Sequence, residues 1–227
     1  MNAPLLILRP EPGASATAAR VAKGGGRAIS TPLFTVKAES WHPPSPDGFD
    51  ALMLTSAHAA RLAGPAIAAY AHLPVYAVGA ATASAARKAG LRQIREGDSD
   101  GQALVERAAR DGISRMLHLA GREHRPLATP GLLIERRIVY AADPVAQLPA
   151  AARSALADDA VTLIHSPRAG TLFRQLLAEA GGSPEKLRLA TISAAAAQAA
   201  GEGWRALAIA RQPTDDALLA AAARLCD

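Results

Sequence analysis

Short apolar runs alternate with longer alanine-rich segments along almost the whole chain. The apolar runs predict strands at 5–8, 28–34, 49–54, 75–78, 93–96, 116–119, 134–140, 161–164, 187–192 and 206–210. The alanine-rich segments predict a first helix that Ser15 or Thr17 caps and that runs through 20–23, and further helices at 57–69, 79–90, 101–112, 125–132, 148–157, 169–180, 193–201 and from 213 onward. Strands that alternate with helices form parallel sheets covered by helices on both faces, so the pattern predicts an α/β fold.

Several of these strands end on hydroxyl or glycine residues immediately before a helix. The stretch MLTSAHAARL (53–62) does so at Thr55 and Ser56, and LIHSPRAGTL (163–172) does so at Ser166. Such a hydroxyl caps the helix, which stabilises it by about 1 kcal/mol. The same helix end also exposes backbone N–H groups and the positive end of the helix dipole, which favour anions.

Ligands of parallel sheets bind beyond the carboxyl ends of the strands. The helix starts are therefore expected to converge on a ligand that bears several carboxylates. The predicted positions are Thr55, Ser56, Gly79, Thr82, Ser166, Ser193 and Thr214.

Two landmarks recur in the same order, which indicates two similar modules. Residues 55–59 match 165–169, and 77–83 match 191–197, at nearly the same spacing. The strands at the N-terminus are too few for a sheet of their own, so we expect them to pair with the last block of the chain. The predicted domains are a discontinuous one of 1–36 and 145–227 and an inserted one of 39–138, with linkers near 35–40 and 138–144.

Composition and charge narrow the class of protein. Half of the 227 residues are hydrophobic and 20% are charged, which suits a soluble chain with buried cores. The formal net charge of +5 is not concentrated in a basic run, and aromatic residues make up only 4%, so no nucleic acid is expected as a partner. The N-terminal apolar run is too short for a signal peptide or a membrane span. The single cysteine, Cys226, allows no internal disulfide. We expect a cytoplasmic monomer that does not bind membranes.

The motifs of several enzyme classes are absent. No GxGxxG follows the first strand, and the chain has no GxxxxGK[ST], HExxH or paired CxxC. Ser166 lacks the glycines of a hydrolase nucleophile elbow. The six histidines are scattered, so neither a metal site nor a cofactor is expected.

Two further residues near strand ends are candidates on chemical grounds. Arg122 follows a predicted strand and is placed to meet an anion. It belongs to the charged cluster REHR (122–125), and such clusters are more often solvated helix starts. Tyr140 ends a strand near the predicted crossing between domains. Its hydroxyl either packs with a satisfied hydrogen bond or donates a proton at the mouth of a site.

The order of seven motifs resembles that of the uroporphyrinogen-III synthase family, over nearly the whole chain. The motifs are LILRPEPGASATAARV, DALMLTSAHAARL, VYAVGAATASAARKAG, LHLAGRE, IVYAAD, LIHSPRAGTLF and ALAIARQPTDDALLAA. The resemblance implies two doubly wound, flavodoxin-like α/β domains, one discontinuous, joined by a two-stranded linker with the active site in the cleft.

The resemblance also implies a cofactor-free lyase that acts on hydroxymethylbilane. Water is lost from the terminal hydroxymethyl group, ring D is inverted and the macrocycle closes as uroporphyrinogen III, a step of tetrapyrrole and haem biosynthesis. The preceding enzyme, hydroxymethylbilane synthase, is implied as a transient partner.

The resemblance gives roles to individual residues. Tyr140 corresponds to the family tyrosine proposed to assist departure of the hydroxyl group. Thr82 corresponds to the threonine after the VG turn, and Pro213-Thr214 to the Pro-Thr before the last helix. The remaining predicted substrate-binding residues are Arg9, Thr55, Ser56, Gly79, Arg122, Ser166 and Ser193.

The chain departs from the family pattern where a threonine is usual and Ala196 stands. Either Ser193 substitutes for that hydroxyl or backbone N–H groups suffice, and we favour the backbone. The missing hydroxyl also supports an alternative, a non-catalytic two-domain sensor that closes on an anionic small molecule. A third hypothesis is a glycosyl- or nucleotidyl-transferring enzyme with two doubly wound domains, which would need a nucleotide site, and the sequence shows no convincing one.

Overall fold

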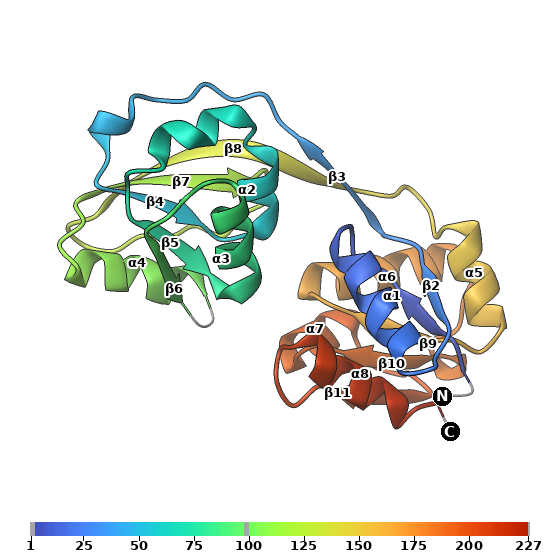
Figure 1. Cartoon of the computed structure of the whole chain (residues 1–227). Helices are drawn as coiled ribbons and strands as arrows, with labels where there is room; N and C mark the ends of the chain where they lie inside the picture. Colours follow the sequence, from blue (N-terminus) through green and yellow to red (C-terminus); the bar gives the residue numbers. More distant parts are fainter. Residues whose placement is uncertain (1–2, 98–99, 227) are drawn as a thin grey trace. The chain divides into compact units, whose positions relative to one another are not determined.

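The protein is described by a computed structural model for residues 3–97 and 100–226. Residues 1–2, 98–99 and 227, which belong to the predicted domains, lie outside the described residues. The chain folds as two compact units (Figure 1). Unit 1 comprises Met1–Thr35 and Asp143–Asp227, and unit 2 comprises Val36–Ala142.

Unit 1 is built on a five-stranded parallel sheet in the order β11-β10-β9-β1-β2. The strands are β1 Leu5–Ile7, β2 Ala28–Ser30, β9 Val161–Ile164, β10 Arg188–Thr191 and β11 Ala206–Ile209. Strand β1 pairs with β2 on one side and with β9 on the other. This is the flavodoxin-like strand order, in which all carboxyl ends share one edge of the sheet.

Helices cover both faces of the unit 1 sheet. They are α1 Gly13–Lys23, α5 Ala150–Ala157, α6 Pro167–Glu179, α7 Ala194–Ala200 and α8 Asp215–Ala223. Helices α1 and α8 bury Val21 and Leu218 against Leu5 and Leu163 on one face. Cys226 is buried in the same cluster, so the chain is packed, not frayed, at this residue. Helices α5, α6 and α7 pack on the strands from the other face.

Unit 2 contains a six-stranded sheet in the order β3-β8-β7-β4-β5-β6. The strands are β3 Phe34–Ala38, β4 Ala51–Leu54, β5 Val75–Val78, β6 Ile94–Gly97, β7 Arg115–Gly121 and β8 Leu133–Pro144. Strands β4 to β8 are parallel to their neighbours and stand in the order 3-2-1-4-5, the other common doubly wound arrangement. The two units therefore share a layered design but differ in strand order.

Helices also cover both faces of the unit 2 sheet. Helix α2 (Ala57–Leu62), the 3₁₀ helix η2 (Pro65–Tyr70) and α3 (Gly79–Lys88) lie on one face, around Leu52, Leu54 and Leu117. Helix α4 (Gly101–Arg110) lies on the other face, around Met53, Tyr76 and Met116. The predicted α/β fold class with parallel sheets is confirmed, and the predicted flavodoxin-like strand order holds for unit 1 but not for unit 2.

Two strands connect the units (Figure 1). The Glu39 amide donates to the Val139 carbonyl at 3.0 Å, and the Val145 amide donates to the Leu33 carbonyl at 3.0 Å. Because one residue number rises as its partner's falls, β3 and β8 run antiparallel. The connection is the two-stranded linker expected from the family resemblance.

The structure corrects several predicted elements. The helix predicted at 125–132 is wrong, since Pro126, Pro130 and Gly131 (φ 81°) give an irregular segment with one bridge from Thr129 to Leu132. In the segment 28–34, Pro32 interrupts the strand as its missing amide predicts, and the segment forms β2 and the start of β3. Two further elements have different bounds: the helix predicted at 57–69 is divided at Gly64-Pro65, and the first helix begins at Gly13, with Pro12 as its N-cap instead of Ser15 or Thr17.

Two further η helices complete the fold, η1 (Pro46–Gly48) and η3 (Pro184–Lys186). No helix within the described residues has the length and apolar character needed to cross a bilayer.

Candidate functional site

The predicted site residues follow strands in the parallel sheets and gather at their carboxyl edges. In unit 1 these are Arg9 after β1, Ser166 after β9, Ser193 after β10 and Thr214 after β11. In unit 2 they are Thr55 and Ser56 after β4, Gly79 and Thr82 after β5, Arg122 after β7 and Tyr140 in β8.

Tyr140 is held in place at the edge of unit 2 by its neighbours. It lies opposite Gly121 in the register of β8 and β7, where the pairing is irregular. Its carbonyl accepts a hydrogen bond of 2.9 Å from the Arg122 amide. The ring of His58, in the first turn of α2, lies 5.6 Å from the Tyr140 ring between centroids. Within the described residues the Tyr140 hydroxyl has no hydrogen-bond partner, so it is available to a ligand.

Arg122 lies beside Tyr140 but is already paired. Its guanidinium donates to the carboxylate of Glu39, and its side chain is 49% exposed. An anion that approached Arg122 would share the guanidinium with Glu39. Arg122 therefore offers part of a positive charge, screened by water.

Thr55 contacts a residue that the sequence reasoning missed. Its Oγ1 lies 3.1 Å from Nε2 of His118, a β7 residue that is 1% exposed. Burial lowers the pKa of His118 to about 3, and repulsion by Arg136 and His124 acts in the same direction. His118 is therefore neutral at pH 7. Its Nδ1 is buried and has no partner within the described residues, so Thr55 supplies the hydrogen bond that this ring has.

The two helix starts that follow β4 and β5 differ in their caps. Ser56 caps α2 by accepting from the His58 amide at 3.2 Å. Helix α3 begins at Gly79 with φ 75° and has no side-chain cap, which leaves its first amides for other acceptors. Thr82 is in the same helix but is 4% exposed, so its hydroxyl presents little surface to a ligand.

Three predicted hydroxyls in unit 1 are also helix caps. Ser166 accepts from the Ala169 amide at 3.2 Å, and Ser193 accepts from the Ala196 amide at 3.2 Å. Thr214 accepts from the Ala217 amide at 3.3 Å. A capping oxygen still carries its own hydrogen, which can be donated to a carboxylate.

The cap at Ser193 bears on the family threonine that Ala196 replaces. The Ala196 amide donates to the Ser193 hydroxyl, and the Ala197 amide donates to the Ser193 carbonyl. The expected backbone donor at Ala196 is thus already engaged. The amides that remain without an intrahelical acceptor at the start of α7 are those that precede Ala196 in the first turn.

Arg9 forms part of a partly buried network around Asp215, the first residue of α8. Its Nη1 donates to Asp215 Oδ1 at 2.8 Å. The other carboxylate oxygen accepts from Thr17 at 2.7 Å, and His165 Nε2 lies 3.2 Å from Oδ1. Burial alone would raise the pKa of Asp215, but the bonds from His165 and Thr17 and the Arg9 charge outweigh it and lower the pKa to about 2.

This network makes Arg9 and Thr214 weaker candidates for binding an anion. The positive charge of Arg9 is largely balanced by Asp215, and the helix start at Thr214 carries two acids, Asp215 and Asp216. Both features weaken the attraction of that helix end for an anion. The side chain of His165 is only 5% exposed, and burial lowers its pKa.

Sequence reasoning missed three residues of these edges, His58, His118 and Asp215. A histidine within the apolar strand RMLHLAG and an acid at a helix start were both visible in the sequence. Their partners lie far away in the chain, so neither pattern identified a contact. Within the described part of the chain, no group of three histidine, cysteine or acidic side chains is arranged to hold a metal ion.

Comparisons with known proteins concern the family and the fold of the chain. A family model described as Uroporphyrinogen-III synthase HemD matches residues 15–220. No curated protein matched the chain. Among solved structures, the chain is similar to a mutant uroporphyrinogen III synthase from the extremely thermophilic bacterium Thermus thermophilus, with 15% identity, a TM-score of 0.54 and 96% of each chain covered.

Two other structures of the enzyme from Thermus thermophilus match at 15% identity with TM-scores of 0.40 and 0.39. The matches cover 99% of this chain and 100% and 96% of those chains. At this identity the mutant structure supports the fold, and the family model identifies the family. The chain belongs to the uroporphyrinogen-III synthase family, a family of haem-biosynthesis enzymes.

Proposed function

We propose that this protein is a uroporphyrinogen-III synthase, a lyase that converts hydroxymethylbilane into uroporphyrinogen III. The observation that carries the proposal is the family match over residues 15–220. In the proposed reaction the terminal hydroxyl group and one proton leave as water, which produces a cationic azafulvene-type intermediate. Ring D is then inverted as the macrocycle closes, with no net oxidation or reduction.

We assign to Tyr140 the role of proton donor to the hydroxyl group that leaves the substrate. Its side chain is half-buried, its ring is held between Gly121 and His58, and its hydroxyl has no acceptor among the described residues. A phenol with these properties can donate its hydrogen to the leaving oxygen. In this role Tyr140 is the catalytic residue.

The carboxylates of the substrate are assigned to the carboxyl edge of each unit. The uncapped start of α3 at Gly79 offers backbone amides, and the Ser166 hydroxyl at the start of α6 offers a further donor. Each helix end contributes about 0.3–1 kcal/mol to binding of an anion. The hydroxyls of Thr55, Ser56 and Ser193 complete the donor set, with weaker roles for Arg9, Arg122 and Thr214.

Most of the rate enhancement in this proposal comes from positioning. The substrate is flexible, and its spontaneous closure gives the uninverted isomer. An enzyme that fixes the carboxylates at many points selects the conformation in which ring D is inverted. We place this reaction in the cytoplasm, carried out by a monomer that receives its substrate from hydroxymethylbilane synthase.

The test is a coupled assay. Hydroxymethylbilane is generated in situ with hydroxymethylbilane synthase, the protein is added, and the oxidised products are separated into type I and type III isomers. A shift from type I to type III supports the proposal. Type I alone, from a protein with a cooperative thermal transition, contradicts it.

The alternative is a sensor that binds an anionic small molecule without converting it. It is favoured by the alanine at position 196 and by the two acids at the start of α8. Recovery of unchanged hydroxymethylbilane from a stable complex with the protein would support this alternative. Formation of the type III isomer would exclude it.

A further inference from the structure

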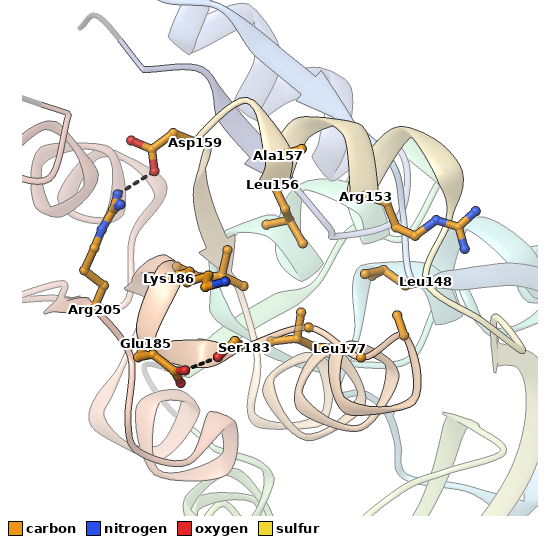
Figure 2. Close-up of a pocket in the computed structure, with 14 residues that line it drawn as sticks. Leu148, Arg153, Leu156, Ala157, Asp159, Leu177, Ser183, Glu185, Lys186 and Arg205 are labelled. Carbon is orange, nitrogen blue, oxygen red and sulfur yellow. Dashed lines mark hydrogen bonds and ion pairs between the residues drawn. The ribbon is translucent and has the colours of Figure 1, made fainter.

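Unit 1 contains a cavity of about 710 Å³ that the proposed reaction does not use (Figure 2). Its lining includes Asp159 just before β9, Leu187 just before β10 and Arg205 just before β11. The cavity therefore lies at the amino edge of the sheet. The helix caps Ser166 and Ser193 lie at the opposite, carboxyl edge of the same sheet.

The floor of the cavity is apolar. Leu148, Leu177 and Leu187 are buried and Leu156 is half-buried, and all four line the cavity. In Figure 2, Leu156 of α5 points into the space above Leu177 of α6. Small residues at the ends of α5 and α6, which include Ala157 and Ala180, leave this space open.

Glycine at position 182 is part of the same packing. A Cβ there would lie 2.2 Å from Cδ1 of Leu177, so a larger residue would push that leucine out of its position. Gly181, just before it, has φ 70°, a conformation that L-residues rarely adopt. The end of α6 is thus shaped to keep an apolar side chain at the cavity floor.

The rim of the cavity is positively charged. Arg153, Lys186 and Arg205 line it, against the two acids Asp159 and Glu185. Both acids are engaged, since Asp159 accepts from Arg188 at 2.8 Å and from Arg205, and Glu185 accepts from Ser183.

Arg153 and Lys186 are exposed and have no hydrogen bond or ion pair from their side chains within residues 3–97 and 100–226. In Figure 2, Arg153 lies at the end marked by Leu148, and Arg205 with Asp159 lies at the other end. A ligand with an apolar body and an acidic group would satisfy both the floor and the rim. The cavity volume falls within the range of small-molecule sites.

We propose that the cavity at the amino edge of unit 1 binds a small amphipathic anion, with the apolar body on Leu156 and Leu177 and the acidic group at the rim, in the positive field of Arg153 and Lys186. The ligand belongs to the class of aromatic or aliphatic carboxylates and sulfonates. This ligand and the substrate bind at different places, because the cavity lies at the amino edge of the sheet and the proposed substrate site lies at the carboxyl edge. Its binding stabilises unit 1 by RT ln(1 + c/Kd), where c is the free ligand concentration, so the stabilisation grows with the logarithm of that concentration once the site is saturated.

The probes are 8-anilinonaphthalene-1-sulfonate and its neutral analogue N-phenyl-1-naphthylamine, which has the same aromatic body without the sulfonate. Both are titrated by fluorescence against the full chain and against Arg153→Gln/Lys186→Gln. The matched control is Lys88→Gln/Arg110→Gln, which removes the same charge from exposed positions of α3 and α4 in unit 2. Leu156→Glu tests whether the apolar floor is the binding surface.

The sulfonate is expected to bind one molecule per chain, and Arg153→Gln/Lys186→Gln is expected to weaken it about tenfold. The neutral probe should bind the charge variant and the wild type alike, and Leu156→Glu should weaken both probes. The control variant should leave both affinities unchanged. The proposal is overturned if the sulfonate does not bind, if the control variant weakens it as much as the rim variant, or if Leu156→Glu has no effect.

Discussion

The Tyr140 ring packs directly on the backbone of Gly121. A Cβ at Gly121 would lie 2.6 Å from Cζ and 2.8 Å from Oη of Tyr140. Such distances are far shorter than a van der Waals contact, so an alanine would displace the phenol. Gly121 therefore determines where the proposed proton donor lies, although it carries no functional group itself.

Gly121→Ala is expected to lower kcat by at least about tenfold, because a misplaced catalytic group of this kind costs that much or more. Gly48→Ala is the matched control, since a Cβ at Gly48 meets nothing within 4 Å. Both variants are compared with the wild type in the coupled assay at saturating substrate. Wild-type kcat in Gly121→Ala would show that the position of Tyr140 is not critical.

Tyr140→Phe is expected to reduce turnover far more than stability. The hydroxyl has no hydrogen-bond partner among the described residues, so its removal breaks no bond in the folded protein. Thermal unfolding should change little, and formation of the type III isomer should fall by about 10²-fold or more. Type III formation at the wild-type rate would remove Tyr140 from the mechanism.

Tyr76→Phe provides the opposite control. The Tyr76 hydroxyl donates to Asp111 at 2.6 Å and accepts from Arg95 at 2.6 Å. Its removal deletes two hydrogen bonds to charged groups, although Arg95 and Asp111 stay paired with each other at 2.6 Å, and it should lower the free energy of unfolding by about 1 kcal/mol. Turnover should stay near the wild-type value, because Tyr76 lies in the middle of β5 and not at its carboxyl end.

The sequence predicted features that depend on neighbouring residues. The caps Ser56, Ser166, Ser193 and Thr214 follow strands and precede helices, and each is found as an N-cap. Their hydroxyls bond amides two or three residues away, so the local pattern contains both partners.

Features that depend on distant partners were not predicted. His118 meets Thr55 across 63 positions of the chain, and Asp215 meets Arg9 across 206. Such contacts arise only once the parallel strands have been ordered in a sheet. The prediction of a helix at 125–132 was wrong for a different reason, because Pro130 removes a backbone donor that the interior of a helix requires.

His118 is expected to make stability depend on pH. Its pKa is lowered to about 3 in the folded state, against an ordinary value of 6.5. Between pH 6.5 and pH 3, His118 is protonated in the unfolded chain but stays neutral in the folded protein. The free energy of unfolding should therefore fall as the pH falls from 6.5 towards 3, with a slope of up to about 1.4 kcal/mol per pH unit from this group.

His118→Gln tests this contribution, since glutamine keeps a polar group near Nε2 for Thr55 but does not titrate. Denaturant unfolding is measured for both proteins at several pH values between 7 and 4. The variant should lose less stability than the wild type as the pH falls. Parallel curves would mean that His118 does not account for the pH dependence.

Asp215 is expected to stabilise unit 1 above its folded pKa. That pKa is lowered to about 2, from an ordinary value of 3.8. A carboxylate with a lowered pKa contributes stability that is fully present above pH 4 and is lost as the pH falls through 2. The shift corresponds to about 2 kcal/mol at pH 7.

Asp215→Asn should therefore lower the free energy of unfolding at pH 7 by about 2 kcal/mol, and the difference from the wild type should shrink towards pH 2. Asp216→Asn is the matched control, because the neighbouring carboxylate is 87% exposed and contacts only Arg20 among the described ion pairs. It should unfold like the wild type at every pH. If both variants lose equal stability, the cause is the charge at the start of α8, and the partly buried network of Arg9, Thr17 and His165 is not responsible.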